Sequence, residues 1–251
     1  MITLFRRIRE KLIASGSVTK YLLYAIGEIL LVVIGILIAL QVNNWNENRK
    51  ASDYEQKVLM EIKNAAQSDI DNIHNYLVGY RGAQRKQSYT YFDRVLKGET
   101  AHEDSLIEHY GWLLYSDTFQ YNSGPYESIK SSGLDKISND SLRGKLANIY
   151  DFTLPRNKEL IDWRYGRFEK TVEEHLPALL EDPRTVIIDG EVRIRRPYKM
   201  IDFTSNEHFL FVYGEAKSAY YWNEERYISS VNLLRELVSL IDLYLQIEGD
   251  Q

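Results

Sequence analysis

The stretch that decides the fold is Tyr21-Leu-Leu-Tyr-Ala-Ile-Gly-Glu-Ile-Leu-Leu-Val-Val-Ile-Gly-Ile-Leu-Ile-Ala-Leu40, in which Glu28 is the only charged residue. An α-helix rises about 1.5 Å per residue, so a helix of this length spans about 30 Å, the thickness of the hydrocarbon core of a bilayer. Tyr21 and Tyr24 stand at one end and Trp45 lies just beyond the other. Aromatic residues occupy these positions at membrane interfaces. The stretch therefore predicts a transmembrane helix over residues 21–42.

Two other interpretations of this stretch are a buried core helix and a cleavable signal peptide. The apolar region of a signal peptide has about 7–15 residues and ends in an A-x-A-like cleavage site. The apolar run here is longer, and Ile38-Ala-Leu-Gln41 offers no such site. Both its length and its charged flanks argue against a core helix. We therefore expect an uncleaved signal anchor.

Basic residues are concentrated on the N-terminal side of the apolar stretch. Residues 1–20 hold one acid and five basic residues, and we expect these five to anchor the tail at the membrane: Arg6, Arg7, Arg9, Lys11 and Lys20. Cytoplasmic flanks of membrane helices carry the excess of Lys and Arg. We therefore expect a cytoplasmic tail over residues 1–20, as an amphipathic helix on the bilayer or as a flexible basic segment. Residues 43–251 are then periplasmic in a Gram-negative cell.

The total charge hides this asymmetry. The chain has 251 residues and a formal net charge of −5, and because residues 1–20 carry +4, the rest carries −9. An acidic body argues against nucleic acid as a partner, because phosphate binding needs clustered Lys and Arg. The chain has no Cys. This excludes a disulfide framework and a thiolate zinc site.

Glu28 is unusual because it lies within an apolar helix, where a carboxylate costs roughly 2.5–3.5 kcal/mol. At about 100° per residue, Val32, Gly35 and Ala39 fall within about 40° of Glu28 on the helical wheel. Gly35 and Ala39 form a small-xxx-small pattern, which allows another helix to approach closely. We predict that this face binds a helix of another membrane protein or of a second copy. In the alternative interpretation, Glu28 is protonated or hydrated and has no role.

Two motifs of the chain resemble a known family. The stretch from Tyr21 to Gln41-Val-Asn-Asn-Trp-Asn-Glu47 is similar to the opening signature of a family of single-pass inner-membrane proteins, catalogued as a domain of unknown function and found mainly in Bacteroidota. Tyr126-Glu-Ser-Ile-Lys-Ser-Ser-Gly133, followed by Ile137-Ser-Asn-Asp-Ser-Leu-Arg143, resembles its mid-chain motif. The resemblance is close over the first 50 residues and looser beyond them. It implies an inner-membrane protein with a helical extracytoplasmic domain and implies no activity.

The remaining chain predicts a mainly α fold, in which a juxtamembrane link over residues 43–52 precedes a helical bundle over residues 53–251. Apolar residues recur every three or four positions from Tyr54 onward. This spacing predicts a long helix to about Lys97, ended by Gly98. A second long helix is predicted around Glu215–Ile247, antiparallel to the first. The polar residues 43–50 are compatible with helix or with a short irregular link.

Shorter elements are predicted between the two long helices. Ser123 is the predicted N-cap of one helix, and Gly133 its predicted stop. Ser138 or Asn139 is predicted to cap the next helix. Pro155 is predicted to open a third helix, which Pro177 should kink or end. Asp189-Gly190 between two β-rich runs predicts a small β-hairpin at about 185–196. A lone hairpin is marginally stable in water, so we expect it to pack on the bundle or on a partner.

Signals for chemistry are weak. No G-x-S-x-G, phosphate loop or H-E-x-x-H sequence occurs, so we expect neither an enzyme nor a cofactor. Asp71 and His74 have a spacing that can present two metal ligands, and they are a weak candidate beside ordinary solvated surface. The 19 Tyr, 8 Phe and 4 Trp suit a core, a ligand groove or an interface, and we favour the core.

These observations predict a membrane-anchored periplasmic interaction protein. Its expected partners are the lipid bilayer and either another membrane protein or a second copy of the chain. One alternative is an energy-coupling, stator-like subunit that uses Glu28. Another is an extracytoplasmic sensor that works through a separate signalling protein. A small-molecule ligand is compatible with the sequence, but no motif supports it.

Overall fold

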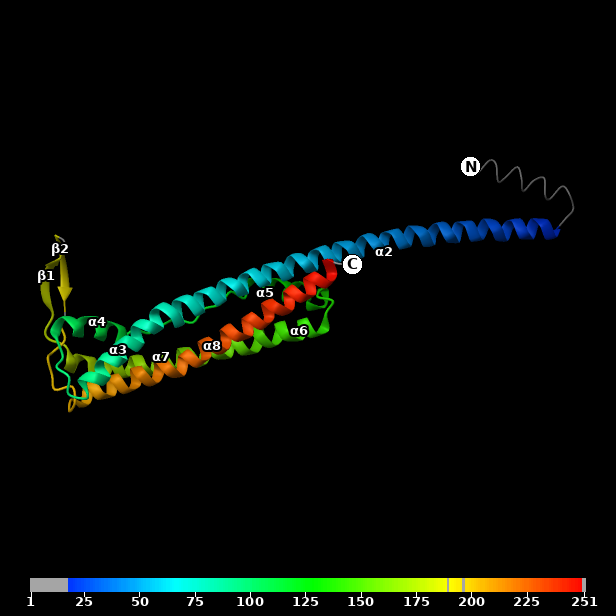
Figure 1. Ribbon diagram of the computed structural model, residues 1–251. Coiled ribbons are helices and arrows are strands. Elements are labelled where there is room, and N and C mark those ends of the chain that lie inside the picture. Colours follow the sequence, from blue (N-terminus) through cyan, green and yellow to red (C-terminus); the bar gives the residue numbers. More distant parts are fainter. Residues whose placement is uncertain (1–17, 189, 196, 250–251) are drawn as a thin grey trace. The chain divides into compact units, whose positions relative to one another are not determined.

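The computed structural model describes residues 18–188, 190–195 and 197–249 (Figure 1). The chain divides into two compact units, the first ending at Glu55 and the second beginning at Gln56. Helix α2 (Val18–Asp71) supplies the described part of the first unit and continues into the second. The fold is mainly α with one small hairpin, as the sequence predicts.

The first unit presents an apolar surface. Large aliphatic side chains from Leu22 to Val42 are exposed, and the most apolar 18-residue window has a mean hydropathy of 2.7 with none of it buried. Among the described residues, this is the one helix long and apolar enough to cross a membrane. A segment of this kind serves either as a membrane span or as a signal sequence. The polar residues 43–50, which the sequence leaves open, are helical.

The second unit is built around long helices. The chain passes from α2 through a π-helix, η1 (Asn72–Arg81), into α3 (Gly82–Val95) without leaving helical structure. Helices α7 (Leu154–Leu179) and α8 (Glu207–Gly249) pack against each other. Figure 1 shows α8 running beside the continuous helical segment that the end of α2, η1 and α3 form.

Ion pairs fix the direction of α8. Lys63 pairs with Asp242 near one end of the unit. Towards the other end, Lys86 lies 2.8 Å from Glu224. Along the helical segment from α2 to α3, the earlier residue thus pairs with the later residue of α8. The predicted antiparallel arrangement is confirmed.

Shorter helices fill the middle of the chain: α4 (Glu103–Leu113), α5 (Gly124–Ser132), the 3₁₀ turn η2 (Leu134–Lys136), α6 (Asp140–Ala147) and the π-helix η3 (Asn148–Thr153). The Asn139 side chain caps α6, because its Oδ1 accepts a hydrogen bond from the Leu142 amide at 3.0 Å. Ser123 stands at the N-cap of α5 and Gly133 at its C-cap, as predicted, although the Ser123 side chain makes no capping hydrogen bond. Asn122 Oδ1 accepts from the Gly124 amide instead, at 3.0 Å.

Aromatic rings form much of the core. Phe92 is fully buried, and the ring centroids of Tyr110 and Phe209 lie 5.3 and 5.1 Å from its own. Phe203 and Tyr213 complete this cluster at 6.2 and 6.1 Å. Offset and edge-to-face contacts at these distances stabilise a core beyond simple area burial. The core interpretation of the aromatic content is confirmed for these rings.

The hairpin lies close to the predicted position. Strands β1 (Arg184–Ile188) and β2 (Glu191–Arg195) pair antiparallel, with Ile187 opposite Val192. Ile187, Val192 and Ile194 are 74%, 71% and 77% exposed. This apolar face therefore does not pack on the bundle. The hairpin is joined to the bundle by the residues that flank its strands. Leu180 and Tyr198 form an antiparallel β-bridge. The Tyr198 ring stacks on the Tyr110 ring, with centroids 4.0 Å apart.

Candidate functional site

The predicted partner-helix face lies on an unbroken part of α2. Glu28, Val32, Gly35 and Ala39 follow one another at spacings of four, three and four residues, which places them on one side of the helix. Val32 is 55% exposed. A Cβ atom added to Gly35 would meet no atom within 4 Å. The face is therefore open to close approach by a second helix.

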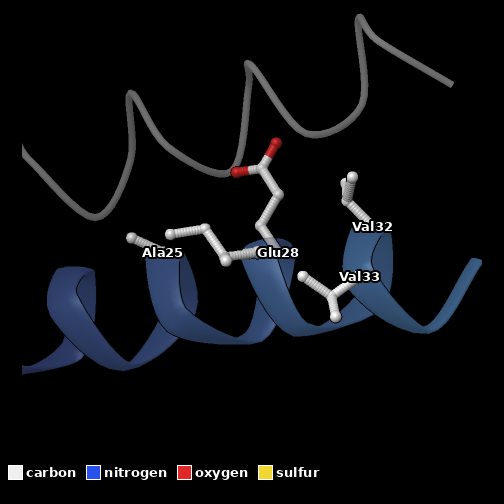
Figure 2. Close-up of a pocket in the computed structure, with 5 residues that line it drawn as sticks. Ala25, Glu28, Val32 and Val33 are labelled. Carbon is white, nitrogen blue, oxygen red and sulfur yellow. The ribbon is translucent and has the colours of Figure 1, made fainter. Parts of the chain in front are cut away.

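Glu28 is the polar group of this face. Figure 2 shows its side chain directed away from the helix axis, with Ala25 and Val32 on the same side. Together with Ile29 and Val33, these residues line an open hollow on the helix surface. A carboxylate among aliphatic side chains favours a partner that offers a hydrogen-bond donor or a positive charge.

The predicted membrane anchors are described only in part. Trp45 is exposed, and the Arg49 guanidinium lies 5.4 Å from the centre of its ring. Tyr24 is half-buried. Lys20 and Tyr21 belong to α2, but their side chains lie outside the described part of the chain. The other predicted anchors also lie outside it: Arg6, Arg7, Arg9 and Lys11.

The weak metal candidate, Asp71 with His74, gains no third ligand among the described residues. Asp71 ends α2 and His74 lies in η1, and both are exposed. Asp71 Oδ1 accepts a hydrogen bond from Gln67 Nε2 at 3.3 Å. No group of three or more His, Cys, Asp or Glu side chains that could hold a metal ion occurs among the described residues. The pair therefore carries no proposal.

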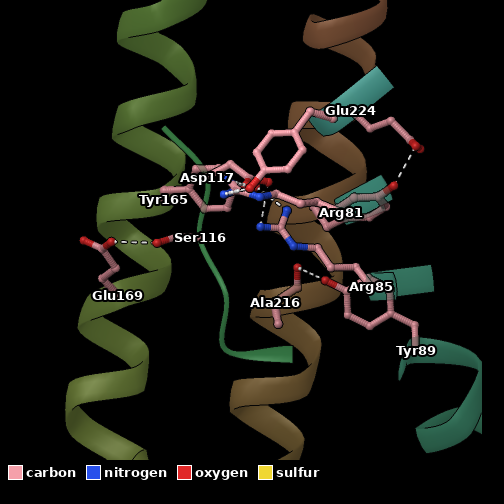
Figure 3. Close-up of polar contacts among 11 residues, drawn as sticks. Arg81, Arg85, Tyr89, Ser116, Asp117, Tyr165, Glu169, Ala216 and Glu224 are labelled. Carbon is pink, nitrogen blue, oxygen red and sulfur yellow. Dashed lines mark hydrogen bonds and ion pairs between the residues drawn. The ribbon is translucent and has the colours of Figure 1, made fainter. Parts of the chain in front are cut away.

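The structure also shows a buried charged cluster that the sequence analysis missed (Figure 3). Arg85 of α3 is 1% exposed, and its Nη2 atom lies 2.7 Å from Oδ2 of Asp117, whose side chain is fully buried. Arg85 Nη1 donates a hydrogen bond to the Tyr165 hydroxyl of α7 at 2.7 Å. Arg81 Nη1 donates to the other Asp117 oxygen, also at 2.7 Å. The cluster thus joins η1, α3, the loop after α4, and α7.

The two guanidinium groups of the cluster stay charged despite burial. Burial lowers the pKa of the Arg85 guanidinium, but Tyr165 and Asp117 outweigh this effect and raise it above its ordinary value. The Arg81 pKa is also raised, since the hydrogen bond and the charge of Asp117 outweigh burial. One carboxylate bound by two guanidiniums is a strong polar contact. With both guanidiniums engaged in this way, we assign the cluster to structure.

A sequence signal for this cluster exists. Arg81-Gly-Ala-Gln-Arg-Lys86 resembles a solvated face by composition. However, the buried positions Ile73 and Leu77 before it and Phe92 after it continue at helical spacing through Arg85. This spacing predicts that position 85 is buried. The burial is easily missed because an arginine stands there. Asp117 lies in a loop, where no periodicity exists to indicate burial.

Comparison with known proteins identifies the family of the chain. No curated protein and no solved structure matches the chain. A family model does match, over residues 28–170. The matched region begins at Glu28, includes both Arg85 and Asp117, and extends into α7. It covers more than half of the chain, which therefore belongs to the family of unknown function DUF6090.

Proposed function

We propose that this chain is a single-pass inner-membrane protein of a Gram-negative bacterium and associates with a membrane partner through one face of α2. In this proposal residues 1–20 are cytoplasmic, residues 21–42 cross the membrane and residues 43–251 are periplasmic. The observation that carries it is the exposed apolar surface from Leu22 to Val42, interrupted by the Glu28 carboxylate.

The exposed surface supports a membrane. Soluble monomers rarely expose a contiguous apolar patch larger than a few hundred Å². Here every large aliphatic side chain from Ile29 to Leu40 is more than two-fifths exposed. Lipid is a solvent in which this exposure is favourable. An α-helix also suits lipid, because all of its backbone groups bond within the segment.

The arrangement of small residues supports a partner helix. Gly35 and Ala39 allow two backbones to approach, which strengthens van der Waals contact between helices in lipid. The cost of placing Glu28 in hydrocarbon falls if a donor on the partner binds it. We favour association with another membrane protein or with a second copy over a role as a simple anchor.

Cysteine crosslinking tests self-association directly, because the chain has no native Cys. Val32→Cys lies on the proposed face, and Leu30→Cys lies on roughly the opposite side of the helix. In native membranes, an oxidant should join Val32→Cys into disulfide dimers and leave Leu30→Cys monomeric. Equal crosslinking at both positions would contradict a specific face.

Two glycines of α2 provide a matched test of close helix packing. This test applies whether the partner is a second copy of the chain or another membrane protein. Gly27 and Gly35 both have space for a side chain, but Gly27 points about 100° away from the proposed face. Gly35→Leu should reduce the crosslinked dimer, or the partner recovered by affinity purification from membranes, whereas Gly27→Leu should not. If the two variants behave alike, the small-residue face is not the interface.

Topology has separate tests. A periplasm-active reporter fused at Gln251 should be active, and a cytoplasm-active reporter fused there should be silent. The intact mass of the membrane-bound protein should include residues 1–20, because we propose no cleavage. A mature chain that begins after residue 40 would instead identify the apolar stretch as a signal sequence.

A second candidate function, energy coupling, is favoured by Glu28 alone. A carboxylate within a membrane helix can carry protons when its protonation changes. Glu28→Gln keeps the shape and hydrogen-bonding capacity of the side chain but cannot ionise. If this variant retains its partner and loses a proton-motive-force-dependent phenotype, coupling replaces simple association as the preferred function.

A further inference from the structure

Four aromatic side chains surround the Arg81 guanidinium at the surface of the second unit. Tyr76 and Tyr80 of η1 stack with ring centroids 6.2 Å apart. The Tyr80 ring meets the Trp112 ring edge-on at 6.1 Å, and the Trp112 and Tyr115 rings are 5.7 Å apart. The guanidinium carbon of Arg81 closes the circuit, at 4.1 Å from the centre of the Tyr76 ring and 4.8 Å from that of Tyr115. We call these five residues the aromatic patch.

The π-helix and the buried ion pair hold the centre of this patch in place. One turn of a π-helix joins residue i to residue i+5, and such turns are frequent at functional sites. Tyr76 and Arg81 have this spacing, and Arg81 Nη2 donates a hydrogen bond to the Tyr76 hydroxyl at 2.6 Å. Arg81 Nη1 is fixed by Asp117 at 2.7 Å. The guanidinium therefore has one orientation before any ligand arrives, which lowers the entropic cost of binding.

The exposed area of the patch suits a small ligand. Tyr76, Tyr80 and Tyr115 are 43%, 55% and 36% exposed. Fully buried aromatic side chains cover about 150–250 Å² each, so the patch offers roughly 300 Å² of surface. A stable protein interface needs about 800 Å² from each partner. The patch is too small for that and large enough for one or two rings of a small molecule.

Charge favours an anionic ligand. Arg81 and Arg85 carry two positive charges against the single negative charge of Asp117. Glu169, which accepts a hydrogen bond from Ser116, is exposed, so solvent screens its charge.

Arg81 also has hydrogen-bonding capacity for such a ligand. Its two described hydrogen bonds use two of its five N–H donors, and its side chain is 20% exposed. A guanidinium with donors to spare suits a carboxylate. A cationic ligand would meet the charge of Arg81 at the centre of the patch.

We propose that the aromatic patch binds a carboxylate-bearing ring compound, with the ring against the exposed aromatic side chains and the carboxylate on Arg81. An aromatic ring makes offset or edge-to-face contacts with such side chains, and a sugar ring directs C–H groups at them. An aromatic acid and a sugar acid therefore share the required chemistry, and the experiment below separates them. The inference goes beyond the membrane role proposed above and does not depend on the orientation of α2.

The experiment is fluorine NMR of the full-length protein in mild detergent, with 5-fluorotryptophan in place of tryptophan. The chain has four Trp, and Trp112→Phe identifies the resonance of the patch. Phenylacetate, glucuronate or both should shift this resonance and leave the other three unchanged, with a dissociation constant of about 1 mM for ligands of this size. The acid that binds more tightly identifies the source. The uncharged counterparts, 2-phenylethanol and glucose, should bind at least tenfold more weakly, because neither can form an ion pair with Arg81.

A matched pair of variants tests the ring contact. Tyr80→Ala removes the most exposed tyrosine of the patch and should weaken binding of the acid at least fivefold. Phe152→Ala removes a 70% exposed ring of η3, outside the patch, and should leave the affinity unchanged. Arg81→Gln should abolish the preference for the acid over its uncharged counterpart, and circular dichroism checks that this variant is folded. The Tyr80 comparison decides the matter even if Arg81→Gln does not fold.

Three results would each overturn the proposal. The first is an unshifted Trp112 resonance at about 10 mM of either acid, whether or not another tryptophan responds. The second is equal binding of the acids and their uncharged counterparts. The third is unchanged affinity in Tyr80→Ala.

Discussion

The guanidinium of Arg85 and the carboxylate of Asp117 form an ion pair inside the helical unit, with side chains 1% and 0% exposed and Nη2 2.7 Å from Oδ2. Removing one partner of such a pair leaves an uncompensated buried charge, which costs about 3–5 kcal/mol. Here the loss of Asp117 would affect Arg81 as well as Arg85. The pair therefore makes the stability of the whole unit depend on one loop residue.

We expect Asp117→Ala to lower the free energy of unfolding by about 3–5 kcal/mol, measured by urea denaturation of the full-length protein in detergent. Asp182→Ala is the control, because Asp182 is exposed. It should change the free energy by less than about 0.5 kcal/mol. A loss below about 1 kcal/mol for Asp117→Ala would show that the cluster is hydrated rather than buried.

Asp69 makes stability depend on pH. Burial raises its pKa from 3.8 to about 6, against the opposing hydrogen bond from the Asn122 amide. The folded protein therefore holds the proton more tightly than the unfolded chain does. The contribution of protonated Asp69 to the free energy of unfolding is about 3 kcal/mol. It is fully present below about pH 4 and is lost as the pH rises to about 6.

Asp69→Asn should remove this loss, because Asn keeps an oxygen to accept from Asn122 and carries no charge. We expect the variant to be more stable than the wild type at pH 8 and to differ less from it at pH 4. Urea denaturation at both pH values measures the difference. Lower stability of the variant at pH 8 would contradict the raised pKa.

Two glycines should respond in opposite ways to alanine. Gly133 has φ +112°, and a Cβ there would lie 2.5 Å from Asp135 Oδ1. Gly133→Ala should destabilise the protein by about 1–3 kcal/mol. Gly144 is exposed within α6, where a Cβ meets no atom within 4 Å. Gly144→Ala should stabilise it by up to about 1 kcal/mol. Thermal unfolding compares the two, and equal shifts would contradict the assigned backbone strain.

The exposed hairpin face should tolerate polar substitution. The double variant Val192→Thr and Ile194→Thr should change the free energy of unfolding by less than about 1 kcal/mol, because both side chains are more than 70% exposed. It should also reduce aggregation in light-scattering measurements. Leu237→Ala, at a fully buried position, is the control and should cost about 2–5 kcal/mol. A loss of similar size in the hairpin variant would mean that the hairpin packs on the bundle.

Local sequence signals predicted much of the fold. The recurrence of apolar residues every three or four positions predicted α8 and the helix that ends at Val95. Asp189-Gly190 predicted the hairpin. The start of α8 was missed by eight residues, since Phe209 and Val212 bury a further two turns that the predicted span omitted. The π-helical segments also escaped prediction, because their residues have ordinary helical composition.

The sequence by itself determined the apolar helix, because twenty successive residues with one charge are a property of composition and order that needs no neighbour. It also determined the positions of most helices and of the hairpin, since caps, glycines and periodicity act locally. Only the tertiary structure decided that Arg85 is buried against Asp117 and that His175 meets His208. Partners 32 or 33 residues apart in the chain are brought together by packing between elements, and no local pattern encodes which charged side chain that packing will enclose.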